Sequence, residues 1–170
     1  MSKTILVLGA GTGGIITANE LSKKIGNTGG TNRIKIILFE KEEKNVFAPS
    51  LLWLMVGKRK LEQIFRSTQK ISGSGIEVII GEIVNVNPEQ ISVTVNGKEY
   101  KGDYMVVSLG VEQVTEHNLN KYGHDFYTLD GATKFNEELH NFKGGKIAVL
   151  VSSMSGCPLR SNNACTKLHP

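Results

Sequence analysis

The chain has 170 residues, 39% of them hydrophobic and 21% charged, and a formal net charge of +4. This composition is typical of one compact soluble domain and argues against disorder, and no apolar run approaches the ~20 residues that cross a bilayer. The positive excess is mild and its one run is Lys58-Arg59-Lys60, so we expect no nucleic-acid partner. Two cysteines do not predict a disulfide framework, and the N-terminus lacks a signal-peptide pattern; we therefore expect a cytoplasmic protein.

The first forty residues predict a strand, a glycine-rich turn, a helix and a second strand. Thr4 to Leu8 is an apolar run without polar alternation, as expected of a strand buried on both faces. Apolar residues at helical spacing follow from Ile15 to Ile25, and a polar turn over residues 26–32 ends that helix. A second buried strand, Ile34 to Phe39, ends on Glu40. This order predicts a βαβ unit, whose two strands are parallel.

The turn after the first strand, Gly9-Ala10-Gly11-Thr12-Gly13-Gly14, fits the pattern G-x-G-x-x-G. The first glycine allows the tight turn, the second lets the backbone approach a pyrophosphate, and the third lets the helix pack closely on the sheet. Phosphates bind the unpaired N–H groups at such a helix N-terminus. We therefore predict that the cofactor is contacted by Gly9, Gly11, Thr12, Gly13 and Gly14.

Glu40 is the acidic residue expected at the end of the second strand, where its carboxylate would accept hydrogen bonds from the adenosine ribose hydroxyls. It lies farther along than the usual ~20 residues, and the polar turn before the strand accounts for the surplus. The alternative is a solvated charge. Lys41 either weakens discrimination against a ribose phosphate or is simply exposed. The pattern by itself does not separate NAD from FAD.

From residue 41 to 110 the sequence predicts more of the sheet and a small antiparallel insertion. The chain is irregular through Pro49, apolar from Leu51 to Val56, and then forms a short helix from about Leu61 that ends near Gly73. A strand from Ile76 to Ile80 returns to the parallel sheet. The segments 83–86 and 91–95 alternate as strands, Asn96-Gly97 predicts a hairpin turn, and residues 103–110 form a buried strand that ends in glycine.

Beyond this strand, residues 112–127 show no period, and an amphipathic helix follows, marked by Ala132, Phe135, Leu139 and Phe142. Lys146 to Val151 repeats the opening strand pattern and predicts the first strand of a second nucleotide-binding unit, cut short after it. The predicted fold class is therefore α/β, a Rossmann-like parallel sheet with helices, a small antiparallel excursion and a truncated second unit.

On these motifs the chain resembles the FAD-dependent pyridine nucleotide–disulfide oxidoreductase superfamily, in particular its sulfide:quinone oxidoreductase and type II NADH dehydrogenase branch. The matching stretches are residues 5–14, 36–40, 47–50 with Trp53 and Gly57, 81–97 and 103–110. The resemblance implies FAD as the cofactor, Pro49 near the flavin ring, and Ile83 offering its backbone to the adenine. At the end of the strand 103–110, family members carry Ala-Thr-Gly, whereas this chain has Ser108-Leu109-Gly110. Only Gly110 therefore matches the family motif. Phe47, Trp53 and residues 51–56 are expected to pack in the core or beside the ring.

The resemblance also covers Cys157-Pro158, a segment in which family members that oxidise sulfide carry a redox cysteine beside the flavin. Cys157 is thus the one catalytic candidate, although no partner cysteine lies near residues 110–114 and Cys165 is out of register. Cys157, Cys165 and His169 lack zinc spacing, so no metal site is predicted. From residue 159 the family pattern is lost, and the tail is expected to be irregular.

These observations predict a FAD-binding Rossmann-like domain (residues 1–110), a linker, helix and truncated unit (111–158) and an irregular tail (159–170). The expected function is that of a sulfide:quinone oxidoreductase-like flavoprotein whose chain is incomplete and inactive alone. The alternatives are a non-catalytic dinucleotide-binding remnant and an NAD-dependent Rossmann dehydrogenase. Quinone or pyridine nucleotide is expected as partner only in a complete homologue, which would lie at the inner face of the membrane. The other expected partner is either a second copy of this chain, through self-association, or a missing C-terminal half.

Overall fold

The computed structural model describes residues 2–26, 34–111 and 119–149. The chain divides into two compact units, Met1–Glu137 and Glu138–Pro170. The elements in chain order are β1 (Lys3–Leu8), α1 (Thr12–Gly26), β2 (Ile34–Glu40), β3 (Lys44–Val46), η1 (Ala48–Ser50), α2 (Leu51–Met55), α3 (Leu61–Ile64), β4 (Phe65–Ser67), α4 (Thr68–Ile71), β5 (Ile76–Ile80), β6 (Ile83–Asn87), β7 (Ser92–Val95), β8 (Lys98–Lys101), β9 (Tyr104–Val107), α5 (Leu119–Tyr122) and α6 (Leu129–Asn141).

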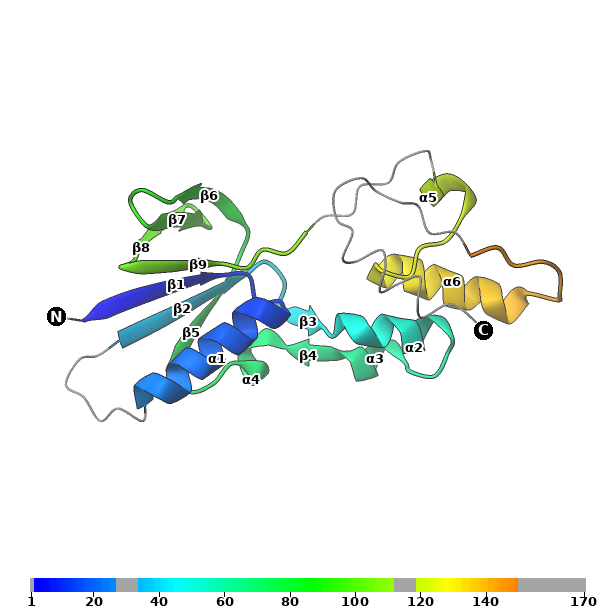
Figure 1. Cartoon of the computed structure of the whole chain (residues 1–170), viewed down its shortest axis with the longest axis horizontal. Coiled ribbons are helices and arrows are strands. Elements are labelled where there is room, and N and C mark those ends of the chain that lie inside the picture. Colours follow the sequence, from blue (N-terminus) through cyan, green and yellow to red (C-terminus); the bar gives the residue numbers. More distant parts are fainter. Residues whose placement is uncertain (1, 27–33, 112–118, 150–170) are drawn as a thin grey trace. The chain divides into compact units, whose positions relative to one another are not determined.

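A four-stranded parallel sheet with the order β5-β2-β1-β9 forms the centre of the first unit (Figure 1). The central strand β1 pairs with β2 on one side and with β9 on the other, so that Leu6 lies between Ile37 and Met105. This arrangement confirms the predicted α/β class with a Rossmann-like parallel sheet. Strand β1 is also the position at which the strand order reverses, because the chain adds strands first on one side of β1 and later on the other. In open α/β sheets, ligands bind at this position.

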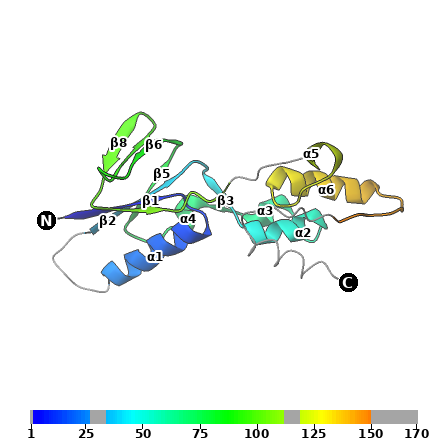
Figure 2. The same ribbon diagram turned by 45° about the horizontal axis from the view of Figure 1, so that its top comes forward.

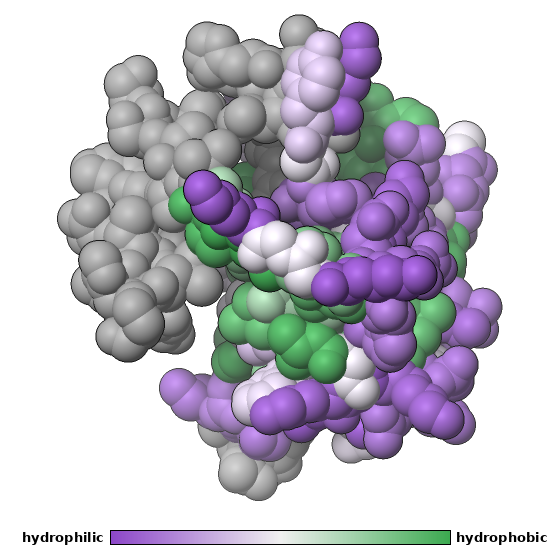
Figure 3. Space-filling view, turned by 90° about the vertical axis from the view of Figure 1, so that its right-hand side faces the viewer, coloured by the Kyte–Doolittle hydropathy of each residue, from purple (hydrophilic) through white to green (hydrophobic). Residues whose placement is uncertain are grey.

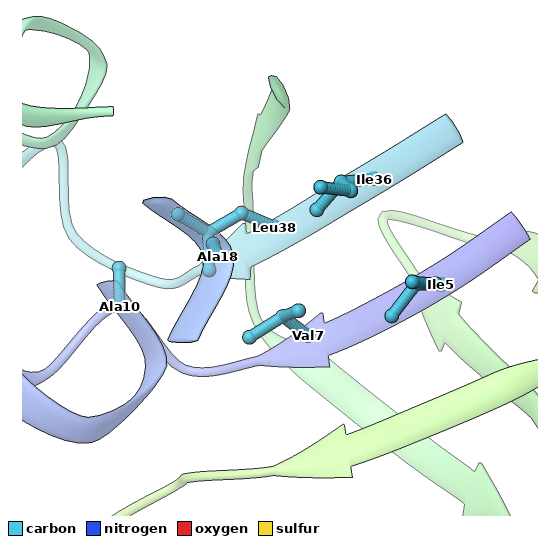
Figure 4. Close-up of a cluster of buried hydrophobic side chains, with 6 residues drawn as sticks. All are labelled: Ile5, Val7, Ala10, Ala18, Ile36 and Leu38. Atoms are coloured by element: carbon cyan, nitrogen blue, oxygen red, sulfur yellow. The ribbon is translucent and has the colours of Figure 1, made fainter. Parts of the chain in front are cut away.

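Both faces of β1 and β2 are buried, which explains why these strands show no polar alternation. Helix α1 covers one face, where Ile5, Val7, Ala10, Ala18, Ile36 and Leu38 form a buried cluster (Figure 4). The alternate residues of the two strands, among them Leu6, Leu8 and Phe39, pack on the other face against Val93 and Val95 of β7. Figure 2 shows α1 and the β6–β8 sheet on opposite faces.

The small antiparallel insertion predicted from the sequence is a three-stranded sheet in the order β6-β7-β8. Its hairpin turn is at Asn96-Gly97, where φ is +52° and +74°. Positive φ at both positions is the geometry that matches the twist of the flanking strands, and it favours asparagine followed by glycine. The Asn96 side-chain amide also donates to the Ile80 carbonyl over 2.9 Å, which joins the turn to the end of β5.

The region from residue 41 to 73 differs from the prediction. Residues 44–46, expected to be irregular, form β3, which pairs with β4 in the register Asn45↔Arg66. The single helix expected from Leu61 toward Gly73 is two short helices, α3 and α4, interrupted by β4. Hydrogen bonds between segments some twenty residues apart thus replace the local helical bonds of residues 65–67, because tertiary pairing outweighs a weak local preference.

A third buried cluster joins α2, α3 and α6 within the first unit. It contains Leu51, Leu54, Ile64 and Ala132. Of the apolar face predicted for the helix, Ala132 is buried, Phe135 and Leu139 are half-buried, and Phe142 is exposed beyond the end of α6. At the start of α6, the Thr128 hydroxyl accepts the Gly131 N–H over 3.0 Å, and the Asp125 carboxylate accepts the N–H groups of residues 127 and 128. These side chains satisfy N–H groups that a helix start leaves unpaired.

Phe47 and Trp53 do not pack in the core of the protein. Phe47 is 54% and Trp53 47% exposed, while Leu51 and Leu54 between and beside them are buried. Helix α2 is therefore amphipathic, and only one side of the apolar run packs inward. Figure 3 shows one face of the molecule, on which hydrophobic surface is surrounded by hydrophilic side chains.

The second unit is described only in part. Of the strand predicted from Lys146 to Val151, residues 146–149 are described and do not form a strand, and residues 150 and 151 lie outside the described part. A strand is stable only when a neighbour satisfies its backbone groups. No strand is paired with residues 146–149 within the described ranges.

Candidate functional site

The glycine loop lies between β1 and α1, at the carboxyl end of the central strand. Gly9 has φ of +90°, and its N–H donates to the Phe39 carbonyl of β2 over 2.8 Å. A Cβ at Gly9 would collide with the backbone carbonyl of Ser108, and one at Gly14 with the carbonyl of Gly9. These two glycines are therefore required by the packing of the loop itself.

Gly11 differs from both of them, because among the described residues no heavy atom, other than those of Gly11 and its two chain neighbours, lies within 4 Å of the position of an added Cβ. The protein thus does not need a glycine here for its own packing. The space beside the Gly11 backbone is open to a ligand, which is what close approach of a pyrophosphate requires.

The loop also presents a set of unpaired donors. The hydrogen bond from the Ile15 N–H to the Gly11 carbonyl, 3.0 Å long, is the first of helix α1. Among the described residues, none accepts a hydrogen bond from the N–H groups of Gly11, Thr12, Gly13 or Gly14. Four N–H groups at the positive end of a 15-residue helix form an anion-binding arrangement.

Glu40 lies at the end of β2, and its carboxylate is bound to the glycine loop. Oε2 accepts the Ala10 N–H over 2.6 Å, and Oε1 accepts the N–H groups of Lys41 at 2.9 Å and Glu42 at 3.3 Å. An ionised carboxylate has about four acceptor sites, so three N–H groups leave capacity for a ribose hydroxyl. Lys41 is exposed.

Asn45, on β3, is a residue of this site that sequence reasoning missed. Its side-chain amide donates to the Ala10 carbonyl over 2.6 Å, in a partly buried position. The loop is therefore held on both sides of the Ala10 Cα atom, by Glu40 at its N–H and by Asn45 at its carbonyl. No local pattern predicts this contact, because it depends on the pairing of β3 with β4.

Ser108, directly after β9, completes the protein side of the loop. Its N–H donates to the Leu8 carbonyl over 2.8 Å, and its side-chain oxygen lies 2.8 Å from where a Cβ of Gly13 would be. The serine in place of the family's alanine thus fits against the start of α1. Gly110 follows with φ of +79° and is exposed.

The other residues predicted to bind the cofactor form no hydrogen bond with the glycine loop among the described residues. Pro49 is exposed in η1 and Ile83 is half-buried at the start of β6, and within the described residues neither forms a hydrogen bond with the loop. Cys157 lies outside the described residues. The described part contains no cluster of three residues suited to a metal ion. Over the same residues, no helix has the length and apolar character of a membrane span.

A parallel sheet whose central strand runs through such a loop into a helix, with an acid at the end of the neighbouring strand, defines a dinucleotide-binding α/β domain. The chain belongs to the pyridine nucleotide-disulphide oxidoreductase family, which it matches over residues 3–159. The superfamily resemblance noted from the sequence is thereby confirmed.

Among its relatives is the mitochondrial sulfide:quinone oxidoreductase of Dictyostelium discoideum, 29% identical over 164 residues, which are 89% of this chain and 34% of that protein. The mitochondrial sulfide:quinone oxidoreductase of Mus musculus is 29% identical over 111 residues, 64% of this chain and 23% of that protein. The chain therefore spans about a third or less of the length of these relatives.

Solved structures agree with this assignment. The sulfide:quinone oxidoreductase of Aquifex aeolicus has a TM-score of 0.69 and 26% identity, over 82% of this chain and 32% of that one. NDH2 of Plasmodium falciparum, at 17% identity and a TM-score of 0.61 over 86% of this chain and 31% of that one, shares the fold.

Proposed function

We propose that this chain binds FAD through its glycine loop and is the dinucleotide-binding part of a flavin-dependent oxidoreductase of the sulfide:quinone oxidoreductase type. The observation that carries the proposal is the contrast within the loop. Gly9 and Gly14 are closed in by backbone, whereas Gly11 is open beside four N–H groups that have no acceptor in the described part of the chain. Family membership supports a flavin as the cofactor class.

In this proposal the pyrophosphate lies on the N–H groups of residues 11–14, where the helix dipole favours its negative charge. Glu40 accepts the ribose hydroxyls while it keeps its bond to Ala10. Pro49 and Gly110 lie toward the flavin ring, and Ile83 lies toward the adenine. In the longer homologues, the cysteine that corresponds to Cys157 is a redox cysteine. Lys41 is an exposed neighbour of the ribose site.

The flavin, when bound, supplies the hydride or electron transfer, and the protein supplies binding and orientation. The residues of this chain that do so are the loop donors, which neutralise the phosphates, and Glu40, which fixes the adenosine end. Quinone and pyridine nucleotide, as reaction partners, are proposed for the full-length relatives, of which this chain spans a third or less.

A FAD titration of the wild type and of two glycine variants tests the proposal. In Gly11→Val the new side chain enters open space, so the melting temperature stays near that of the wild type while FAD affinity falls more than tenfold. In Gly14→Ala the new Cβ meets the Gly9 carbonyl, so stability and affinity fall together. Affinity is followed by flavin fluorescence, with NAD as the competing ligand.

Equal FAD affinity of the wild type and Gly11→Val would show that the loop is not the binding site. NAD binding that is tighter than FAD binding would favour the alternative of an NAD-dependent Rossmann enzyme. If neither dinucleotide binds, the chain is a remnant without cofactor function.

A further inference from the structure

We propose that Asn45 is a positioning residue that aims the Gly11 N–H at the pyrophosphate, an inference that rests on the function proposed above. Asn45 has no place in the glycine pattern, and it lies 35 residues from Ala10 in the sequence. Its amide nevertheless donates to the Ala10 carbonyl over 2.6 Å, the same length as the Glu40 bond on the other side of that residue.

The direction of the Gly11 N–H follows from peptide geometry. The Ala10 carbonyl and the Gly11 N–H belong to one planar trans peptide, in which the two groups point in opposite directions. A donor that fixes the carbonyl therefore fixes the N–H as well. Gly11 is exposed and has open space at the position of an added Cβ, so a ligand can approach its backbone.

Asn45 also binds the carbonyl that a helix one residue longer would use as its first acceptor. In a longer helix the Gly14 N–H would bond to the Ala10 carbonyl, four residues earlier. The structure has no such bond between these described residues, and the Asn45 amide takes that carbonyl instead. Helix α1 begins at Thr12, and among the described residues the Gly14 N–H has no acceptor, so it is available to an anion together with the Gly11 N–H.

The position of Asn45 is set by strand pairing. Antiparallel pairing of β3 with β4 places Asn45 opposite Arg66, between the pairs Lys44↔Ser67 and Val46↔Phe65. The backbone of Asn45 is therefore fixed before any ligand binds. This pre-organisation lowers the ordering cost of binding.

The experiment compares the full chain with Asn45→Ala and with the matched control Asn19→Ala. Asn19 also donates its amide to a distant carbonyl, that of Ile71 over 3.0 Å, but it lies on α1 away from the loop. Affinities for FAD, ADP and adenosine are measured by calorimetry or ligand-observed NMR, and stability by urea denaturation. Adenosine lacks phosphates and reports on the ribose site alone.

We expect Asn45→Ala to weaken FAD and ADP about five- to twentyfold and adenosine less than about twofold. Asn19→Ala, which removes hydrogen bonds to both Ile71 and Gly73, should lower stability at least as much and leave all three affinities unchanged. Asn45→Gln, which keeps the amide donor, should bind ADP more tightly than Asn45→Ala. Should Asn45→Ala not fold, Asn45→Val, which suits a strand and also lacks the amide donor, gives the ratio of ADP to adenosine affinity that decides.

An equal loss of ADP and adenosine affinity, or no loss relative to Asn19→Ala, would overturn the role of Asn45 while leaving the FAD site in place. A wild type that binds neither FAD nor ADP would overturn the proposed function, and the inference with it. The two failures are therefore distinguishable by the wild-type titration alone.

Discussion

The Glu40 carboxylate accepts the Ala10 N–H over 2.6 Å, so the acid at the end of β2 is hydrogen-bonded to the glycine loop at the end of β1. The two parts of the proposed site are thus one connected structure before a ligand is present. A hydrogen bond from an N–H to a charged group contributes about 1.5–3 kcal/mol. Glu40 therefore has a structural as well as a binding role.

Replacing Glu40 with alanine should consequently change two quantities. Loss of the Ala10 partner should lower the free energy of unfolding by ~1–3 kcal/mol, and loss of the ribose contact should weaken FAD about ten- to a hundredfold. Urea denaturation and a FAD titration measure the two effects. Glu42→Ala, the removal of an exposed carboxylate two residues on, is the control and should change neither. If Glu40→Ala binds FAD as tightly as the wild type, the ribose site does not include Glu40.

At the opposite end of β1, Asp103 should make stability depend on pH. The Thr4 N–H donates to Asp103 Oδ2 over 2.7 Å and holds the pKa of this carboxyl below its ordinary value, and Lys3, whose Nζ is 3.3 Å from Oδ1, lowers it further. Because the pKa is lower in the folded state, the stabilisation is complete above the unfolded pKa of about 4 and is lost as the pH falls through the folded value.

The unfolding free energies of wild type and Asp103→Asn should therefore differ at pH 7, and this difference should shrink as the pH falls below about 4 and through the lowered folded pKa of Asp103. Added salt at 1 M should reduce the difference only in part, because it screens the Lys3 charge but not the hydrogen bond from Thr4. A difference that stays constant as the pH is lowered from 7 through the whole acid range would argue against this origin.

Strand β9 should promote self-association of the chain. It ends the parallel sheet in the described part of the chain, and its residues Tyr104 and Val107 are 56% and 63% exposed. An unpaired apolar edge is a template for pairing with another chain. Sedimentation velocity should show association that increases with protein concentration and is reduced in Val107→Lys. Leu52→Lys places the same charge on an exposed apolar position of α2 and should have no such effect; equal effects of both variants would exclude the edge as the cause.

The chain of 170 residues is expected to bind FAD without efficient turnover. Orientation of donor and acceptor contributes up to ~7–11 kcal/mol to such reactions, and the described residues provide one dinucleotide loop and no second one. With FAD, sulfide or NADH and a soluble quinone, the rate should stay below about one per second. The Aquifex aeolicus sulfide:quinone oxidoreductase is the positive control. Flavin-dependent turnover at ordinary enzyme rates would contradict the expectation.

The features predicted correctly from the sequence are those that depend on a few consecutive residues. Buried strands β1 and β2 follow from apolar runs, the loop from its glycines, and the Asn96-Gly97 turn from residues that accept positive φ. Each of these depends on the conformational preferences of a few consecutive residues, and each is found where it was predicted.

Tertiary structure alone decided the rest of the site. The β3–β4 pairing joins residues about twenty apart and turns a predicted helix into α3, β4 and α4, since hydrogen bonds across strands outweigh a weak helical preference there. That pairing also brings Asn45 to Ala10, a contact that no sequence period encodes. Likewise, Gly9 is closed in by the carbonyl of Ser108 after β9, and Gly14 by the carbonyl of Gly9 across the loop. Gly11 is closed in by no described residue beyond its chain neighbours, so three glycines that look equivalent in the sequence have different physical roles.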